Sequence, residues 1–254
     1  MPGKVFLLTG APGTGKTTAA NLLVENIRPL KRVDFGRVLL EHRQRRSAAK
    51  LSRAAIRKKS AELISHKDVA AMDDWFARKV QTWHLTQNIL LDSHAVTKEA
   101  FGFRVTPYNL AQLEKIGFDA ILVMHCEPKE LVRRIKSRPG GRRVPTVHEA
   151  AQHQYLQESL ALTYGVASGC PCFVIDTTKN KARRLLETLL KILEYVGTPF
   201  TTSSAPPGKG KKTRGRSLPI IPTSAGLNAK LNGRFTYTNP SNPSPKPSSS
   251  SAPV

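Results

Sequence analysis

Cysteines and long apolar runs are scarce in this sequence, and each scarcity excludes a class of protein. Its 254 residues include three cysteines, Cys126, Cys170 and Cys172, which cannot form the disulfide framework of a small secreted domain. The pair Cys170-Pro171-Cys172 lacks the second pair that a zinc site needs. No run of about 18 apolar residues is present, so we expect no transmembrane helix and no membrane contact. With no room for a signal peptide before the first apolar run, a reduced, cytoplasmic setting fits best.

Acidic residues are absent from the end of the chain. The net charge is +22, yet all 18 acidic residues precede residue 200, and residues 201–254 contain eight Lys and Arg. Pro, Ser, Gly, Thr and Asn dominate there, so we predict a disordered tail over residues 198–254. A basic segment attracts polyanions, and nucleic acid is one predicted partner of the tail. A tail that only increases solubility is the alternative.

One motif near the N-terminus points to nucleotides. Residues 10–18 follow an apolar run and precede an expected helix, and they match the phosphate-binding loop pattern G-x-x-x-x-G-K-[ST]. Its glycines let the backbone wrap around an anion, and the N–H groups at the helix start point at the phosphates. We predict that Lys16 reaches the β- and γ-phosphates of ATP and that Thr17 ligates Mg²⁺. The predicted phosphate-binding residues are Gly10, Ala11, Pro12, Gly13, Thr14, Gly15, Lys16, Thr17 and Thr18.

A second metal ligand is expected at the end of another apolar run. Asp92 follows residues 88–91, which are too few for a helix, and an acid at the end of a strand is typical of the residue that holds Mg²⁺ beside a phosphate loop. The alternative is an aspartate that only caps the next segment. Two residues later, His94 is a candidate for substrate contact or for a structural loop histidine.

Strand and helix patterns alternate along the first 197 residues. We predict an α/β fold of the P-loop NTPase class, with a five-stranded parallel sheet covered by helices on both faces. The expected strands are residues 4–9, 32–36, 88–94, 118–126 and 172–176. The expected helices are residues 19–25, 37–59, 67–86, 109–115, 131–135, 147–163, with Tyr164-Gly165 as its C-cap, and 181–196. Ligands then bind at the carboxyl ends of the strands.

Arginines gather around a Gly/Pro hinge after the fourth strand. They are Arg133, Arg134, Arg138, Arg142 and Arg143. We predict an arginine-rich lid over residues 136–146, with Arg134 and Arg138 acting beside Lys16 in catalysis, because arginines offset the charge of a transferring phosphoryl group. A basic surface loop is the alternative. Residues 37–87 form a predicted helical acceptor-side region, whose basic part, 37–59, is either a flap over an anionic substrate or a solvated helix face.

The length of the chain and the motifs that it lacks limit the classes of reaction that the protein could catalyse. Large motor and AAA-type ATPases normally need a longer chain, and the N/T-K-x-D motif with which GTPases read guanine is absent. A small nucleotide kinase needs only this size, five strands and an arginine-rich lid.

The sequence resembles the archaeal-type adenylate kinases over roughly residues 4–195. The matching stretches are 9–18, Val33 to Val38, Leu91 to His94, 118–123, 130–135, and His153-Gln154-Tyr155 with Thr163-Tyr164-Gly165. The resemblance implies a nucleoside-monophosphate kinase that converts ATP and AMP to two ADP with Mg²⁺, and it implies a trimer. It also implies an acceptor side at Phe35, Gly36, Arg57 and His94.

Two departures from the family's sequence pattern leave the identity of the phosphoryl acceptor open. Residues 100–107 replace the family's Gly-Tyr-Leu-Pro-Gly-Leu-Pro stretch, and Gln157-Glu158 replaces its Asn-Arg pair. Three alternatives therefore stay open. The protein is a kinase with another acceptor, a weak ATPase, or a nucleotide-binding protein that acts with RNA or ribosomes through its basic surface and tail.

Overall fold

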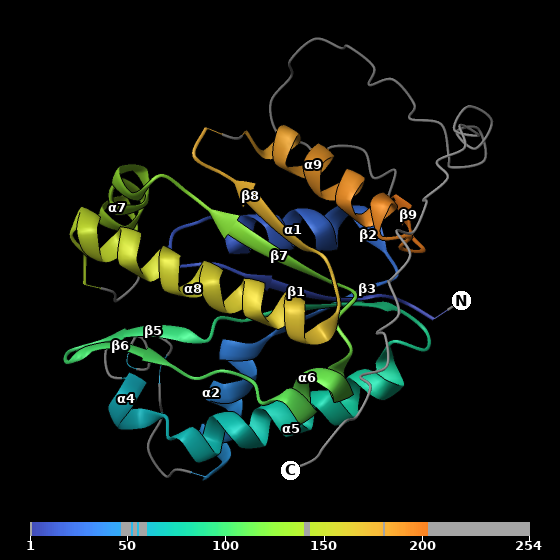
Figure 1. Ribbon diagram of the computed structural model, residues 1–254, viewed down its shortest axis with the longest axis horizontal. Coiled ribbons are helices and arrows are strands. Elements are labelled where there is room, and N and C mark those ends of the chain that lie inside the picture. The colour runs from blue at the N-terminus through green and yellow to red at the C-terminus, as the bar shows by residue number, and fades with distance from the viewer. Residues whose placement is uncertain are drawn as a thin grey trace, which may run out of the picture. The chain divides into compact units, whose positions relative to one another are not determined.

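A five-stranded parallel sheet forms the centre of the fold in the computed structural model (Figure 1). The structure describes residues 2–46, 52, 55, 60–139, 143–179 and 181–202. The strand order is β3 (Leu30–Asp34), β4 (Asn88–Asp92), β1 (Val5–Thr9), β7 (Ala120–His125) and β8 (Cys172–Asp176). All five predicted strands are present and parallel, so the predicted fold class is confirmed.

Helices cover both faces of this sheet. Helices α5 (His66–Trp83), α6 (Leu110–Ile116) and α8 (Val147–Ser168) pack on one face, and α1 (Lys16–Asn26) and α9 (Ala182–Tyr195) pack on the other (Figure 1). Alternate residues of β1 enter the two cores: Val5 and Leu7 join the first, Phe6 and Leu8 the second. A strand buried on both faces reads as a continuous apolar run, which is why its position could be predicted.

A hairpin that was not predicted follows β4. Strands β5 (Val96–Glu99) and β6 (Gly102–Val105) pair in antiparallel register, with Lys98 opposite Phe103. Arg104 forms an ion pair with Glu99 at 3.1 Å and donates to the Ile64 carbonyl oxygen at 3.1 Å, next to α4 (Ser60–Leu63). The contact with Ile64 joins residues 40 positions apart in the chain, which local sequence patterns do not reveal.

Helix α8 continues past its predicted end. Gly165 lies inside the helix, and the C-cap is Gly169, whose φ of 62° favours glycine, so the predicted Tyr164-Gly165 cap is wrong. A Cβ atom on Gly165 would lie 3.2 Å from the Cys170 carbonyl oxygen and 3.4 Å from Cys172 Cβ. The glycine therefore allows the helix to approach the start of β8 closely.

The remaining elements complete the domain. Helix α2 (Phe35–Arg46) starts directly after β3, and α7 (Pro128–Ser137) follows β7. The rest of the helix predicted over 37–59 falls almost wholly outside the described residues. Strands β2 (Ile27–Arg28) and β9 (Thr201–Thr202) form a small antiparallel pair, and β9 lies beyond the predicted domain end at residue 197.

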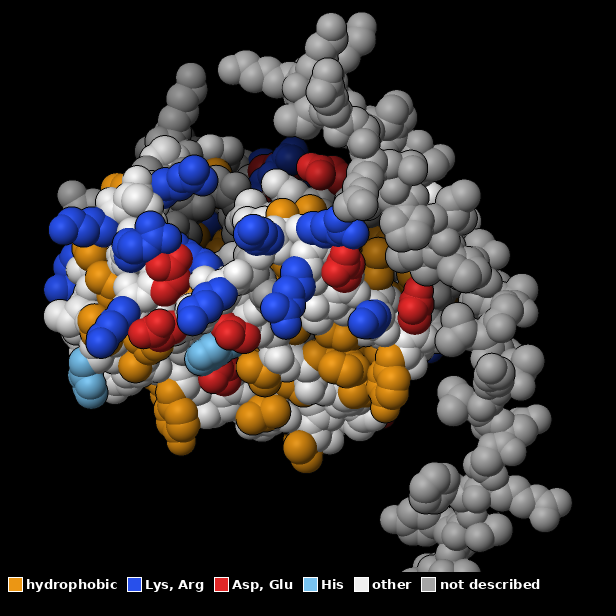
Figure 2. Space-filling model, turned by 90° about the horizontal axis from the view of Figure 1, so that it is seen from above, with side chains coloured by type: hydrophobic (Ala, Val, Ile, Leu, Met, Phe, Trp, Pro, Cys, Tyr) orange, Lys and Arg blue, Asp and Glu red, His pale blue; other side chains and the backbone are white. Residues whose placement is uncertain are grey.

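Charge is spread over the folded part of the chain. Figure 2 shows Lys and Arg side chains with acidic side chains between them on the face seen from above. Residues 1–200 hold 32 basic and 18 acidic residues, so the folded part has an excess of 14 positive charges without the tail. Beyond Thr202 the tail lies outside the described residues, and its predicted binding of nucleic acid remains a prediction. Among the helices that are described, none is long and apolar enough to cross a bilayer.

Candidate active site

A cavity of about 1250 Å³ opens at the carboxyl ends of the sheet strands. Its lining comes from the loop after β1, the ends of β3 and β4, the β5–β6 hairpin, α7 and α8. Pockets for one small ligand are typically about 300–1000 Å³. The cavity therefore has room for two nucleotides side by side.

Three glycines set the backbone of the loop between β1 and α1. Gly10, Gly13 and Gly15 have φ angles of 140°, 90° and 97°, all in the region that side chains disfavour. Gly15 is the N-cap of α1 and provides no side-chain cap, so the first N–H groups of the helix remain available to a ligand. The loop residues line the cavity, as a phosphate site at a helix N-terminus requires.

Lys16 and Thr14 fold back onto the same loop. Lys16 Nζ donates to the Gly10 carbonyl oxygen at 2.5 Å, and Thr14 Oγ1 donates to the Ala11 carbonyl oxygen at 2.8 Å. Thr14 is fully buried, whereas Lys16 and Thr17 line the cavity. The loop is thus held by its own side chains, with the ammonium group next to the expected position of the phosphates.

Replacing Gly10 by alanine is expected to distort this loop. A Cβ atom there would lie 2.5 Å from the Met124 carbonyl oxygen, a backbone atom that cannot move aside. Gly102→Ala is a matched control, because its φ of 138° is almost the same as the 140° of Gly10 but no atom lies within 4 Å of the added Cβ. Backbone strain costs about 1–3 kcal/mol at either site. In urea unfolding, Gly10→Ala should lose more free energy of unfolding than Gly102→Ala, and it should also bind ATP more weakly. Equal losses of unfolding free energy in the two variants would contradict the steric argument.

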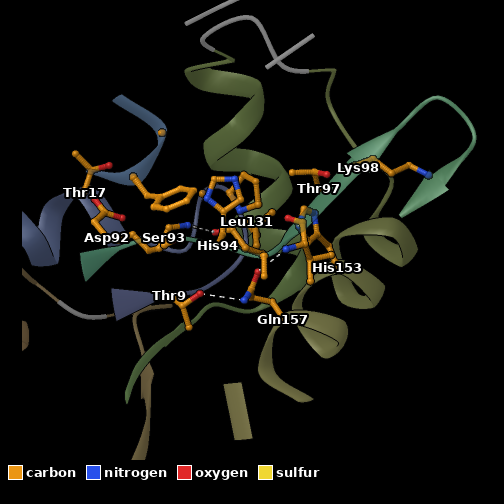
Figure 3. Close-up of a pocket in the computed structure, with 18 of the residues that line it drawn as sticks. Thr9, Thr17, Asp92, Ser93, His94, Thr97, Lys98, Leu131, His153 and Gln157 are labelled. Carbon is orange, nitrogen blue, oxygen red and sulfur yellow. Dashed lines mark hydrogen bonds between the residues drawn. The ribbon is translucent and has the colours of Figure 1, made fainter. Parts of the chain in front are cut away.

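Thr17 and Asp92 lie next to each other at the cavity wall (Figure 3). A hydroxyl and a carboxylate are the oxygen ligands that Mg²⁺ prefers, usually together with water and substrate phosphates. No group of three His, Cys, Asp or Glu side chains that could hold a metal occurs within the described ranges. The residues present therefore fit an ion that enters with phosphates rather than a dedicated metal cage.

Arg32 from β3 was missed by the sequence reasoning. Its Nη2 donates to Asp92 Oδ2 at 2.5 Å and its Nη1 to Asn21 Oδ1 of α1 at 2.8 Å. The guanidinium therefore orients Asp92 and ties two strands to α1. A single arginine in a strand of mixed composition gives no sequence signal, because its partner lies 60 residues away in the chain.

Most arginines of the predicted lid are paired with carboxylates. Arg133 and Arg134 bind Glu130 at 2.6 and 2.8 Å, and Arg143 binds Glu149. These two hydrogen bonds lower the pKa of Glu130 to about 2. Arg138 is exposed and lines the cavity, and its side chain makes no hydrogen bond or ion pair in the part of the chain that the structure describes. Arg142 lies outside the described residues.

Arg134 connects the phosphate loop with the loop after β8. Its Nη2 donates to the carbonyl oxygens of Thr177 and Thr178 at 2.7 and 3.1 Å, and its Nη1 reaches the Gly13 carbonyl oxygen at 3.5 Å. Thr177 Oγ1 in turn donates to the Thr14 carbonyl oxygen at 2.7 Å. Most of the Arg134 donors are therefore bound to protein, and Thr177 is a further site residue that the sequence did not indicate.

The predicted acceptor-side residues line the same cavity. Phe35 is 8% exposed and starts α2 together with Gly36, and His94 lies exposed two residues after the end of β4. The fourth predicted residue, Arg57, lies outside the described residues. The structure thus brings three of the four to the cavity that the phosphate loop opens into.

Helix α8 fixes the hairpin to the phosphate-loop strand. Gln157 Nε2 donates to Thr9 Oγ1 at 2.9 Å, and Gln157 Oε1 accepts from the Val96 N–H at 3.2 Å (Figure 3). Glu158, the residue that departs from the kinase pattern, pairs instead with His125 Nδ1 at 2.6 Å. Neither Glu158 nor His125 lines the cavity, so this departure places no negative charge on the cavity wall.

The sequence is similar to those of archaeal adenylate kinases. The adenylate kinase of Pyrococcus horikoshii is 28% identical over 194 residues, covering 75% of this chain and 95% of the relative. That of Methanococcus aeolicus is 27% identical over 200 residues, covering 77% and 100%. Among solved structures, the deoxyadenosine kinase from M. mycoides matches with a TM-score of 0.46 and 14% identity, covering 75% of this chain and 99% of that chain.

The predicted resemblance is confirmed, and with it the enzyme class, an adenylate-kinase-like phosphotransferase. The family model described as "AAA domain" matches residues 9–151. That match covers more than half of the chain and includes the phosphate loop, Asp92 and the arginines of α7. The chain therefore belongs to the AAA-domain family that this model describes.

Proposed function

We propose that the protein transfers the γ-phosphoryl group of ATP to AMP and forms two molecules of ADP. The observation that carries the proposal is one cavity that joins the phosphate loop to the Phe35 and His94 side and is large enough for two nucleotides. Two bound nucleotides with their phosphates facing each other turn a bimolecular reaction into one between positioned groups.

The donor phosphates would lie on the loop. The N–H groups from Gly13 to Thr18 point at them, and Lys16 exchanges its contact with the Gly10 carbonyl oxygen for phosphate oxygens. Arg134 holds Gly13 and the Thr177 loop in place, so its proposed role is to position the phosphate loop. Arg138 carries the cation that faces the cavity without a carboxylate partner within the described residues, and it is the arginine that would stabilise the transferring group.

Thr17 and Asp92 would hold Mg²⁺ with the donor phosphates. When bound, the ion neutralises charge on the β- and γ-phosphate oxygens. Arg32 keeps Asp92 directed toward this position through its 2.5 Å contact.

An acceptor screen tests the proposed reaction. Purified full-length protein with ATP and Mg²⁺ is given AMP, dAMP, GMP, CMP or UMP, and ADP formation is followed against time. We expect AMP to be the best acceptor, ATP hydrolysis without an acceptor to be slow, and chelation of Mg²⁺ to stop the transfer. Turnover with none of the monophosphates would overturn the proposal.

A further inference from the structure

An aspartate occupies the buried face of α5. Asp73 is 4% exposed and lies one turn or two before Phe76, Ala77 and Val80, all of which are part of the apolar core. It lines the cavity together with Phe35. An acid on the apolar side of a helix is rare unless a partner compensates its burial.

No partner within the described residues compensates Asp73. Its carboxyl group makes no hydrogen bond and no ion pair there. The nearest carboxyl group along the helix, Asp74, accepts from Gln112 Nε2 of α6 at 3.0 Å. Two basic side chains of α2 lie near a different acid: His42 and Arg43 are 4.0 and 3.5 Å from Asp68.

Two tyrosines face Asp73 from other elements. Tyr108 precedes α6 and Tyr164 belongs to α8, and the charge of Asp73 helps to raise the pKa of both. Tyr164 Oη accepts from the Tyr108 N–H at 2.9 Å. The Tyr108 hydroxyl is buried and has no well-formed hydrogen bond in the described part, although Ser93 is close enough to oppose the rise in its pKa.

Two polar groups at one end of the cavity are therefore left without partners. Each buried, unpaired polar group costs about 1–3 kcal/mol. Both Asp73 and Tyr108 line the cavity, as do the apolar side chains of Phe35, Leu39 and Val69. Apolar walls with a few convergent polar groups are the usual construction of a pocket for a flat heterocycle.

Burial determines the protonation state of Asp73. Desolvation, together with the charge of Asp74, raises its pKa to about 8, so the group is a neutral carboxylic acid at pH 7. A protonated carboxyl group offers one O–H donor beside one carbonyl acceptor. A ring nitrogen next to an exocyclic amino group, the arrangement in adenine, matches that pair in both positions. Guanine presents two adjacent donors at its N1 and N2 and would need the carboxylate.

We propose that Asp73, buried on the cavity wall with Phe35 and Tyr108, is a specificity-determining residue whose carboxyl group reads the amino-substituted edge of the acceptor base. The proposal rests on the function proposed above, because it places the acceptor base between Phe35 and Tyr108. It identifies the acceptor class as monophosphates whose base presents a ring nitrogen beside an amino group, which is adenine among the purines and cytosine among the pyrimidines.

The test is the pH dependence of monophosphate binding. Calorimetry at pH values from 7 to 9.5 measures the Kd of AMP and GMP for the full chain. For the unmodified protein, AMP affinity is expected to fall about tenfold for each pH unit above the pKa of Asp73, while GMP binding becomes relatively stronger. Asp73→Asn keeps a donor and an acceptor, so it should bind AMP with no pH dependence. Asp73→Leu should weaken AMP binding about 10- to 100-fold at every pH.

Asp74→Asn is the matched control on the same helix. Asp74 does not line the cavity, so the variant should still bind AMP. The charge of Asp74 helps to raise the pKa of Asp73, so its removal lowers that pKa and the loss of AMP affinity should begin at a lower pH than in the unmodified protein. A flat AMP Kd for the unmodified protein, or unchanged binding by Asp73→Leu, would overturn the proposal. Since binding is measured without turnover, AMP binding with this pH profile but no ADP formation would refute only the kinase reaction.

Discussion

Replacing Lys16 by alanine is expected to remove nearly all phosphoryl transfer. The ammonium group lies at the phosphate loop and binds the Gly10 carbonyl oxygen at 2.5 Å, so it is the cation closest to the expected donor phosphates on this loop. Removing one positioned donor from a charge-stabilising site costs about 10²–10³ in rate. Initial rates of ADP formation from ATP and AMP measure the loss, and binding of ATP by calorimetry separates lost affinity from lost catalysis.

Lys129→Ala is the matched control for charge. Lys129 is exposed on α7 and does not line the cavity, so its removal lowers the net charge equally and should leave the rate unchanged. Unfolding in urea should show a loss of about 1 kcal/mol for Lys16→Ala, the usual net contribution of a hydrogen bond such as the one from Lys16 Nζ to the Gly10 carbonyl oxygen. A Lys16→Ala rate within tenfold of the unmodified protein would contradict the assigned role.

Asp73→Asn is expected to stabilise the protein increasingly as pH rises from about 4 to 8. In the unfolded chain the carboxyl group ionises near its ordinary value of 3.8, whereas in the folded protein its pKa is about 8. Between these values the folded state holds a proton that the unfolded state has released, so raising the pH favours unfolding. Each pKa unit corresponds to about 1.4 kcal/mol, which gives an effect on the order of 4 kcal/mol at pH 7.

The quantity to measure is the difference in free energy of unfolding between Asp73→Asn and the unmodified protein, as a function of pH. The asparagine amide stays polar and buried, which adds a constant cost of about 1–3 kcal/mol at all pH values. Urea unfolding of both proteins at pH 4.5, 6, 7 and 8 should show the variant gaining relative to the unmodified protein up to about pH 8. A difference that does not change with pH would show that Asp73 ionises normally in the folded state.

Local sequence patterns were sufficient to predict the central sheet and the phosphate loop of this protein. The phosphate loop could be predicted because its glycines, Lys16 and Thr17 are adjacent in sequence and their geometry depends on backbone conformation. The five strands could be predicted because strands buried on both faces are apolar throughout. The position of Asp92 at the cavity could be predicted because the carboxyl ends of parallel strands meet at one edge of the sheet.

One sequence signal was present and was not used. Asp73 stands among Met72, Phe76 and Val80 at the spacing of a buried helix face, and an acid at such a position indicates either a compensating partner or a ligand. By contrast, Gly165 resembled a helix end, because the sequence does not show that β8 passes within contact distance of the helix.

The sequence by itself determined the fold class, the phosphate-binding loop and the kinase family, since each depends on residues close together in the chain. Only the tertiary structure decided which cavity-lining arginine lacks a carboxylate partner among the described residues, and that Arg134 binds backbone oxygens. It also decided that Glu158 pairs with His125 and that the Asp73 carboxyl group has no partner in the described part of the chain. These properties depend on which groups meet across 30 to 120 residues of chain, and hydrogen bonding and desolvation act through space rather than along the sequence.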